Sequence, residues 1–222
     1  MATVNLIDMK FSDSKIIKSL DLLTTIILLF YVAFLCVKLF DSGAPALSNS
    51  LKGYAVYDIQ AKPRDDKNVR SLDDWFGKKV VVQPTNKALV DLRFKSYGEL
   101  FSLPALLYQV SQLLYWLLIG FLILCIKKLF SSFRKDEVFT TRNASLILWG
   151  STVLMLLPVM RSITQYLFIN CITKLNLNDS GYMLQKGVGF IAAETLIGLA
   201  LLAFGLVFKT AIAIKKENDS FI

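Results

Sequence analysis

Histidine is absent from this 222-residue sequence, and charged residues make up only 19% of it. Without histidine there is no Ser-His-Asp or Cys-His catalysis, no His-ligated zinc or haem, and no histidine pH switch. The charged fraction lies below the roughly 25% of an ordinary soluble domain. Because 55% of the residues are hydrophobic while Lys and Arg outnumber Asp and Glu by 25 to 17, we expect a small polytopic membrane protein whose cations lie outside the bilayer.

Motifs for nucleotide, metal and nucleophile chemistry are also missing. There is no Walker lysine loop and no GxGxxG, GxSxG or HExxH pattern, and the cysteines have no metal-ligand spacing. Cys36, Cys125 and Cys171 fall in or beside apolar segments, which favours packed thiols; a Cys36–Cys171 disulfide is the alternative. We therefore expect a protein that is not an enzyme and that binds neither a metal nor another cofactor.

Four segments are apolar and long enough to cross about 30 Å of hydrocarbon, which takes about 20 helical residues. They are residues 22–40, 103–126, 144–171 and 188–208. The first resembles a signal peptide, but its apolar run of 19 residues is too long for a signal core, so an uncleaved signal anchor is favoured. The sequence predicts an all-α integral membrane protein built as a four-transmembrane-helix bundle.

Cations in the short connecting segments predict the orientation of the chain. Segment 1–21, loop 127–143 and tail 209–222 contain eleven Lys and Arg residues, against two in loop 172–187. Both termini are therefore expected on the cytoplasmic side. Segment 41–102 is long enough to be exported despite its ten basic residues, because long loops largely escape the rule. The basic loop fits a plain positive-inside anchor, with contact to anionic headgroups or nucleic acid as the alternative.

Segment 41–102 is the part of the chain large enough to fold in water. Residues 53–61, 79–83 and 88–94 read as strands, the last two as a hairpin around residues 84–87. Apolar and charged residues alternate from residue 90 to 95, as in a half-buried strand. We expect a small β-rich extracytoplasmic domain between the first two transmembrane helices. It either only packs on the helices or forms a sensing or partner-binding surface.

Lys38 lies close enough to the end of the first span to reach the membrane surface. Two further charged residues lie inside the predicted spans, where a charge is costly and needs a partner or a task. They are Arg161 and Glu194. At a rise of 1.5 Å per residue, both lie about 7–9 Å below the same outer surface, on consecutive antiparallel helices, so we predict an Arg161–Glu194 ion pair. The expected buried polar cluster also contains Gln109, Gln112, Thr164 and Gln165. This cluster is either a ligand pocket or ion path, or a structural pair that fixes the helix register.

Small residues recur along the fourth span. Gly187, Glu194, Gly198 and Gly205 are spaced by seven, four and seven residues, so they form one stripe on a helix. Such a stripe favours close packing against a neighbouring helix, with Glu194 toward the bundle interior.

Two short stretches carry a family resemblance. The basic loop contains Phe139, Thr140 and Asn143, with Gly150 after it, and the chain ends in a tail that contains Glu217, Asn218, Asp219 and Ile222. Both stretches resemble the bacterial membrane family catalogued as domain of unknown function 2975, with its FxxGxxFTxxN-like loop and its xEN/QDLTI-like tail. The chain departs from that pattern at Asp136, where glycine is common, and at Ser220-Phe221, which replace Leu-Thr.

The resemblance implies a four-span protein of the bacterial inner membrane. It also implies a neighbouring gene for a small Cro-like helix-turn-helix regulator, and it implies no established activity. From the residues themselves, Thr140 is expected to cap the third span, because its hydroxyl can accept from a free amide in the first turn. The seven motif residues in the loop and tail are either a helix cap and a helix stop, or a docking surface for a cytoplasmic partner.

We therefore expect a non-enzymatic sensing or regulatory protein that holds a soluble cytoplasmic partner, with a small helix-turn-helix regulator as the partner that the resemblance implies. The alternative is a transport, immunity or membrane-complex accessory subunit that uses the Arg161/Glu194 cluster. Expected partners are the lipid bilayer and either another protein or a second copy of the chain. Direct binding of nucleic acid is not expected, and the sequence does not identify a small-molecule ligand.

Overall fold

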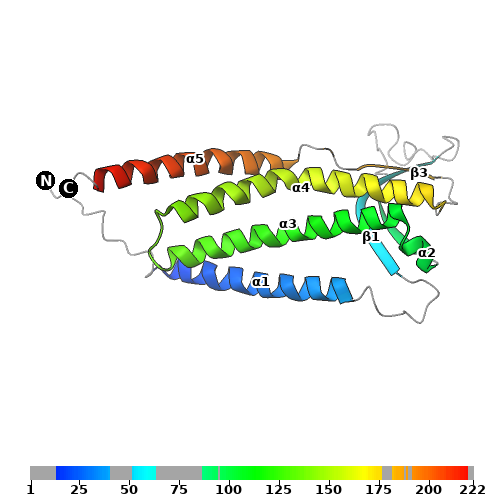
Figure 1. Ribbon diagram of the computed structural model, residues 1–222, viewed down its shortest axis with the longest axis horizontal. Helices are drawn as coiled ribbons and strands as arrows, with labels where there is room; N and C mark the ends of the chain where they lie inside the picture. The colour runs from blue at the N-terminus through cyan, green and yellow to red at the C-terminus, as the bar shows by residue number, and fades with distance from the viewer. Residues whose placement is uncertain are drawn as a thin grey trace, which may run out of the picture. The chain divides into compact units, whose positions relative to one another are not determined.

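Four of the described helices are long and apolar enough to cross a membrane, as the sequence predicts. They are α1 (Lys15–Phe40), α3 (Leu103–Phe133), α4 (Thr141–Lys174) and α5 (Ala193–Asp219), shown in Figure 1. The structure is a computed structural model, and it describes residues 14–40, 52–63, 87–94, 96–176, 182–187, 189 and 192–219. Large apolar side chains along these helices, such as Phe30 and Val207, are exposed, as expected of residues that face lipid. The chain is a mostly helical, multi-pass membrane protein.

The helices extend beyond the apolar runs that predict them. In α3, helical hydrogen bonding continues past residue 126 to Phe133, and α1 already begins at Lys15. In contrast, α5 begins at Ala193, five residues after the predicted start of the fourth span. Glycines at positions 187 and 189 disfavour a helix there, and the backbone N–H of Ala192 donates to the Thr195 hydroxyl at 3.4 Å. The helix therefore starts where its first turn is capped.

The chain divides into two compact units. The first unit comprises Met1–Asp41, Tyr115–Pro158 and Ile191–Ile222, and the second comprises Ser42–Leu114 and Val159–Phe190. Helices α3 and α4 contribute residues to both units, while α1 and α5 belong to the first.

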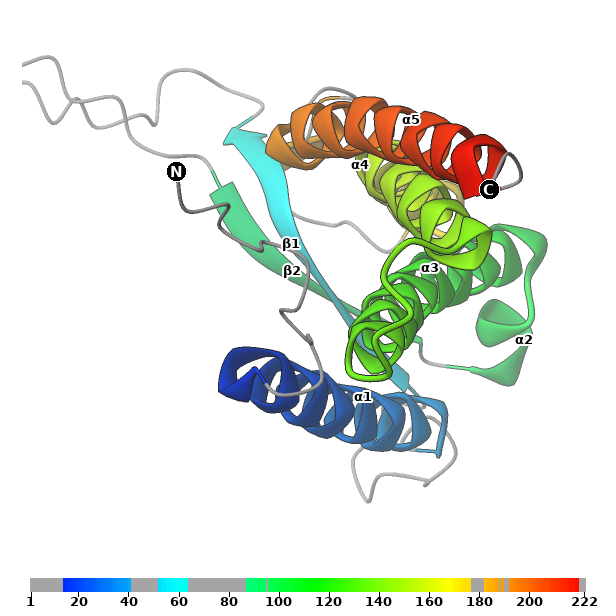
Figure 2. The same cartoon turned by 90° about the vertical axis from the view of Figure 1, so that its left-hand side faces the viewer.

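In the first unit, α1 packs against α3 through a tyrosine that lies over a glycine. The Tyr31 hydroxyl donates a hydrogen bond to the carbonyl of Trp116. A Cβ at Gly120 would lie 2.9 Å from the Tyr31 ring, so only glycine leaves room for it. Phe34 packs edge-on against the Trp116 ring, with 5.0 Å between the centroids. Figure 2 shows α1 alongside α3 from the end.

The two glycines in α5 lie against α4, as their spacing predicts. A Cβ at Gly198 would lie 2.7 Å from Met155 Cγ and 2.9 Å from the backbone oxygen of Ser151. A Cβ at Gly205 would lie 2.9 Å from Leu148 Cδ2. Both helices therefore approach each other more closely than any larger side chain would allow, which increases their van der Waals contact.

The second unit contains a three-stranded antiparallel sheet in the order β2-β1-β3. Its strands are β1 (Lys52–Pro63), β2 (Lys87–Phe94) and β3 (Tyr182–Gln185). Strands predicted at residues 53–61 and 88–94 are present as β1 and β2, which pair with each other. The strand predicted at residues 79–83, and with it the hairpin, lies outside the described residues. Strand β3 was not predicted; it lies within the expected loop 172–187.

A buried apolar cluster joins this sheet to the helices of the second unit. Phe94, the last residue of β2, is fully buried beside Leu100 of the short helix α2 (Tyr97–Leu100). The Tyr108 ring of α3 and the Phe168 ring of α4 lie in the same cluster, with centroids 5.2 Å apart. Phe94 is the last of the alternating apolar residues of β2, and its side chain packs in the cluster with residues of α2, α3 and α4.

The three cysteines are free thiols. Cys125 and Cys171 are buried, as predicted for packed thiols, whereas Cys36 is exposed on α1. The alternative of a Cys36–Cys171 disulfide is therefore wrong. Cys171 instead belongs to the apolar cluster of the second unit.

Candidate functional site

Two glutamines of the predicted polar cluster bind backbone groups next to their helices. Gln109 Nε2 donates to the carbonyl of Leu100 at 3.0 Å. Gln165 is almost fully buried, and its Oε1 accepts from the backbone N–H of Gly187 at 3.2 Å. Each amide satisfies a backbone group that has no partner of its own in a helix or strand. These two contacts hold the end of α2 and the segment before α5 against α3 and α4.

Two other members of the cluster carry buried oxygen atoms without a hydrogen bond. Gln112 Oε1 and Thr164 Oγ1 have no hydrogen-bond partner in the described part of the chain. The Tyr108–Phe168 contact sets the register of the antiparallel helices. Gln112 lies four residues after Tyr108 and Thr164 lies four residues before Phe168, so both are one turn from that contact and at the same level. The second unit thus has two unsatisfied polar atoms at one depth.

Arg161 and Glu194 are both half-buried. They belong to different units of the chain, Arg161 to the second and Glu194 to the first. Each side chain has an interaction partner. Their ion pair stays a prediction.

The α3–α4 turn is closed by a Schellman motif. Asp136 adopts the left-handed conformation, with φ of 59°. Its N–H bonds to the Phe133 carbonyl, and the next N–H, that of Glu137, bonds to the Ser132 carbonyl, both at 3.1 Å. This is the position where helices prefer glycine, since glycine has no Cβ to clash. Aspartate is among the few residues other than glycine that tolerate this conformation.

Asn143 and Thr140 build the other side of this turn. The Asn143 side chain is fully buried, and its Nδ2 donates to the carbonyls of Glu137 at 2.5 Å and Val138 at 2.9 Å. The Thr140 hydroxyl accepts from the Asn143 N–H at 3.2 Å, which confirms Thr140 as the N-cap of α4. Both motif residues therefore fix the backbone on either side of residue 139.

Phe139 projects from this fixed turn toward α5. Its ring stacks on Phe208, with centroids 5.5 Å apart and planes at 29°. Phe208 in turn stacks on Phe204 at 6.0 Å. The Lys215 ammonium lies 5.7 Å from the centroid of the Phe139 ring. We call these four residues the Phe139 stack; Phe139 itself remains 54% exposed.

The tail motif continues from this stack along the last turn of α5. Glu217 and Asn218 are exposed, and Asp219 is the last helical residue. Ile222 lies outside the described residues. The predicted motif therefore divides into residues that build the turn, Thr140 and Asn143, and residues that are exposed, Phe139, Glu217 and Asn218.

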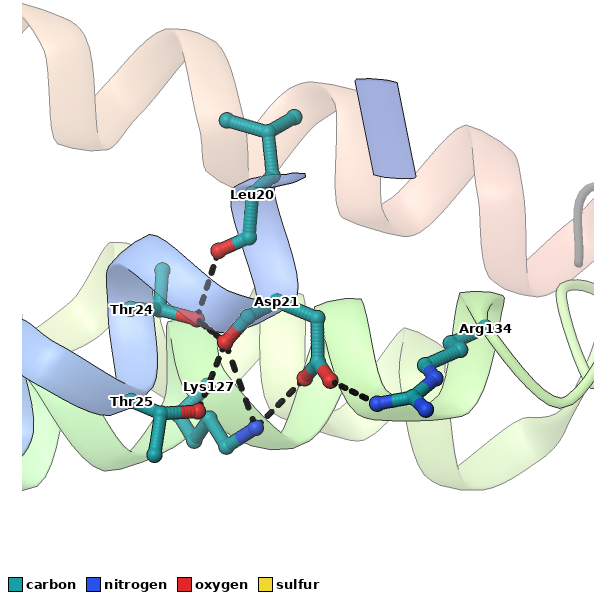
Figure 3. A network of polar contacts seen from close by, with 6 residues as sticks. All are labelled: Leu20, Asp21, Thr24, Thr25, Lys127 and Arg134. Atoms are coloured by element: carbon teal, nitrogen blue, oxygen red, sulfur yellow. Dashed lines mark hydrogen bonds and ion pairs between the residues drawn. The ribbon is translucent and has the colours of Figure 1, made fainter. Parts of the chain in front are cut away.

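A buried acid at the start of α1 was missed by the sequence analysis. The Asp21 carboxylate binds Lys127 Nζ of α3 at 2.5 Å and Nη1 of Arg134, the residue after α3, at 3.1 Å (Figure 3). The Asp21 carbonyl accepts from the hydroxyls of Thr24 at 3.1 Å and Thr25 at 2.6 Å. We call these five residues the Asp21 network. Its one sequence signal is the seven-residue spacing of Lys127 and Arg134, which places both cations on the same side of the C-terminal end of α3, since the Arg134 N–H still bonds to the Phe130 carbonyl.

The described residues contain no group of three His, Cys, Asp or Glu side chains that could hold a metal ion. Comparison with protein families gives one match, to a family model described as "Protein of unknown function (DUF2975)", over residues 85–222. No curated protein and no solved structure matches the chain.

Proposed function

Since the chain belongs to the DUF2975 family of proteins of unknown function, whose model covers more than half of it, we propose a function from its own contacts. The protein is a non-enzymatic sensing or regulatory protein of the bacterial inner membrane. It holds a soluble protein partner at the surface formed by the Phe139 stack and the end of α5.

The membrane topology that this function needs has both termini and the α3–α4 turn in the cytoplasm. The eleven cations of segments 1–21, 127–143 and 209–222 support this orientation. Segment 41–102 would then form, together with β3, a small β-rich domain on the opposite side of the membrane. That domain, or the polar cluster around Arg161, is where a signal would be received.

The observation that carries the proposal is the exposure of an aromatic ring on a rigid turn. Asn143 and the Schellman motif fix the backbone on both sides of Phe139. Binding a partner at Phe139 therefore costs little additional conformational entropy. A half-exposed aromatic ring beside a lysine is the kind of residue that contributes most to protein interfaces. Contacts with Phe208 and Lys215 also place the Phe139 ring against α5, the helix that carries the tail motif.

The first partner to test is a small helix-turn-helix regulator, which the family resemblance implies. Held at the membrane, such a regulator would be kept from its DNA sites without any direct contact between this chain and nucleic acid.

Site-specific photocrosslinking in living cells tests the proposal. A photoreactive amino acid at position 139 is expected to crosslink a soluble protein, identified by mass spectrometry. Position 149 is the matched control, since Trp149 is also an exposed aromatic residue but lies eight residues into α4, about 12 Å along the helix. Crosslinks to the same proteins from both positions, or to none from position 139, contradict the proposal.

An accessory subunit in transport, immunity or a membrane complex is the second candidate. The observation in its favour is the pair of unsatisfied oxygens at Gln112 and Thr164, since polar atoms inside a membrane protein often line a path for ions or polar ligands. Loss of a transport or protection phenotype in a Thr164→Val variant that folds normally would favour this candidate.

A further inference from the structure

Arg134 is the exposed member of the Asp21 network. Its side chain is 59% exposed, whereas the Asp21 side chain that it binds is only 6% exposed. A guanidinium has five N–H donors, and the ion pair with Asp21 runs through Nη1 alone. Arg134 is therefore held in place by a buried acid while most of its hydrogen-bonding capacity faces outward.

The surroundings of Arg134 are strongly positive. Residues 14–21 and 127–137 contain six cations and three acids, Asp21, Asp136 and Glu137, which leaves an excess of three positive charges. The cations are Lys15, Lys18, Lys127, Lys128, Arg134 and Lys135. Because Asp21 is buried against Lys127, its charge is largely neutralised, and an approaching anion meets the excess of cations.

Apolar side chains stand directly beside this charge. Leu22 and Leu23 follow Asp21 in α1 and are exposed, and Ile126 precedes Lys127 in α3 and is exposed as well. An anion that fits here carries hydrocarbon chains. A phospholipid headgroup has this combination, and an inorganic phosphate does not.

We propose that Arg134, oriented by Asp21 and flanked by Lys127, binds the phosphate of an anionic phospholipid. The site lies at the membrane surface that the α3–α4 turn faces, and it rests on the membrane orientation given under the proposed function, not on the partner. Arginine suits this task because its planar fork donates two parallel hydrogen bonds to one phosphate. The lipid would contact α1 and the end of α3 on their exposed surface, whereas Asp21 joins them within the buried interface between them.

Lipid titration of the purified full-length protein in a nonionic detergent tests the site. Phosphatidylglycerol is expected to raise the unfolding temperature in a saturable manner, because a ligand that binds only the folded state stabilises it. Phosphatidylcholine and inorganic phosphate are the controls for a lipid without net charge and for a phosphate without acyl chains. Equal stabilisation by either control overturns the proposal.

Three variants separate a built site from general attraction to a basic surface. Arg134→Gln should raise the half-saturating phosphatidylglycerol concentration by about tenfold. Arg142→Gln removes another exposed arginine, in the first turn of α4, and should change the half-saturating concentration by less than about fivefold. Arg134→Lys keeps the charge and the fold but loses the two parallel donors of the guanidinium. Its half-saturating phosphatidylglycerol concentration should therefore be close to that of Arg134→Gln.

Equal effects of Arg134→Gln and Arg142→Gln overturn the site, and so does full retention of binding in Arg134→Lys. The proposed partner surface is separable, because Phe139→Ala should leave the lipid titration unchanged. A lipid effect that persists while crosslinking at position 139 fails would therefore refute the partner and keep the lipid site.

Discussion

The Asp21 carboxylate of α1 and the Lys127 ammonium of α3 lie 2.5 Å apart, although 106 residues separate them along the chain. Asp21 is the buried partner, and its second oxygen binds the more exposed Arg134. A buried carboxylate without a cation would lose its hydration with no ion pair to compensate. Lys127 of α3 and Arg134 just after it therefore fix the position of α1.

The two ion pairs of Asp21 should contribute unequally to stability. In double-mutant cycles built from Asp21→Asn with Lys127→Gln or Arg134→Gln, the coupling energy for Lys127 should be about 1–2 kcal/mol and that for Arg134 below about 1 kcal/mol. Lys127 is the less exposed cation, at 21%, so water screens its pair less. Unfolding in detergent measures both values. A larger coupling for Arg134 would contradict the assignment of Lys127 as the main partner.

Replacing Gly198 by alanine should destabilise the protein, whereas replacing Gly150 by alanine should not. Gly198→Ala should lower the free energy of unfolding by about 1–3 kcal/mol, because the new Cβ overlaps the backbone of Ser151 as well as Met155. Gly150→Ala is the control. Its Cβ would meet Leu122 and Cys125 at 3.7 and 3.9 Å, ordinary contact distances, so stability should be kept or should rise slightly. Equal losses in both variants would contradict the close α4–α5 packing.

Asp136→Gly should stabilise the protein by about 0.5–1 kcal/mol, since glycine adopts the left-handed conformation of the turn without steric cost. Asp136→Val should destabilise it by more than that, because a β-branched residue is strained there. Thermal unfolding of both variants is the measurement. A stabilising valine would show that position 136 does not need φ above zero.

Asn143→Ala should lower stability by about 2 kcal/mol, because it removes the donor that two backbone carbonyls share and leaves a small cavity. Arg142→Ala, one residue earlier and exposed, should stay within about 0.5 kcal/mol of the parent protein. The same Asn143 variant should also reduce crosslinking at position 139, since Phe139 would lose its fixed backbone. Unchanged crosslinking would separate turn rigidity from partner binding.

Thr164→Val should raise the free energy of unfolding by about 1 kcal/mol if the Thr164 hydroxyl is unsatisfied, because valine has the same shape without the polar atom. Thr152→Val is the control, because the Thr152 hydroxyl bonds to the Leu148 carbonyl at 2.9 Å and its loss should not stabilise. A loss of stability in Thr164→Val would mean that water or a ligand occupies the site.

Periodic and compositional features of the fold were predictable from sequence. The four spanning helices follow from apolar runs that only a helix can carry through hydrocarbon. Strands β1 and β2 follow from their β-branched and aromatic residues, and the α4–α5 contact follows from the spacing of Gly198 and Gly205. Strand β3 was not predictable, because four residues carry too little pattern and its pairing with β1 is non-local.

The candidate site was predictable only in part. The loop motif identified Asn143 and Phe139 as residues of interest. The sequence does not show that the Asn143 amide binds the carbonyls of the turn, nor that the Phe139 ring is exposed. Asp21 was counted as the last residue of a cytoplasmic segment. A lone acid at the edge of an apolar run has no local signature for partners more than a hundred residues away.

That separation also has a consequence for how the chain is made. Ribosomes add about 5–20 residues per second, so the 106 residues between Asp21 and Lys127 take roughly 5 to 20 s to synthesise. Throughout that interval the Asp21 carboxylate of α1 has no cation from α3 to pair with. The ion pair that joins α1 to α3 therefore forms only after α3 has been synthesised, late relative to the synthesis of α1.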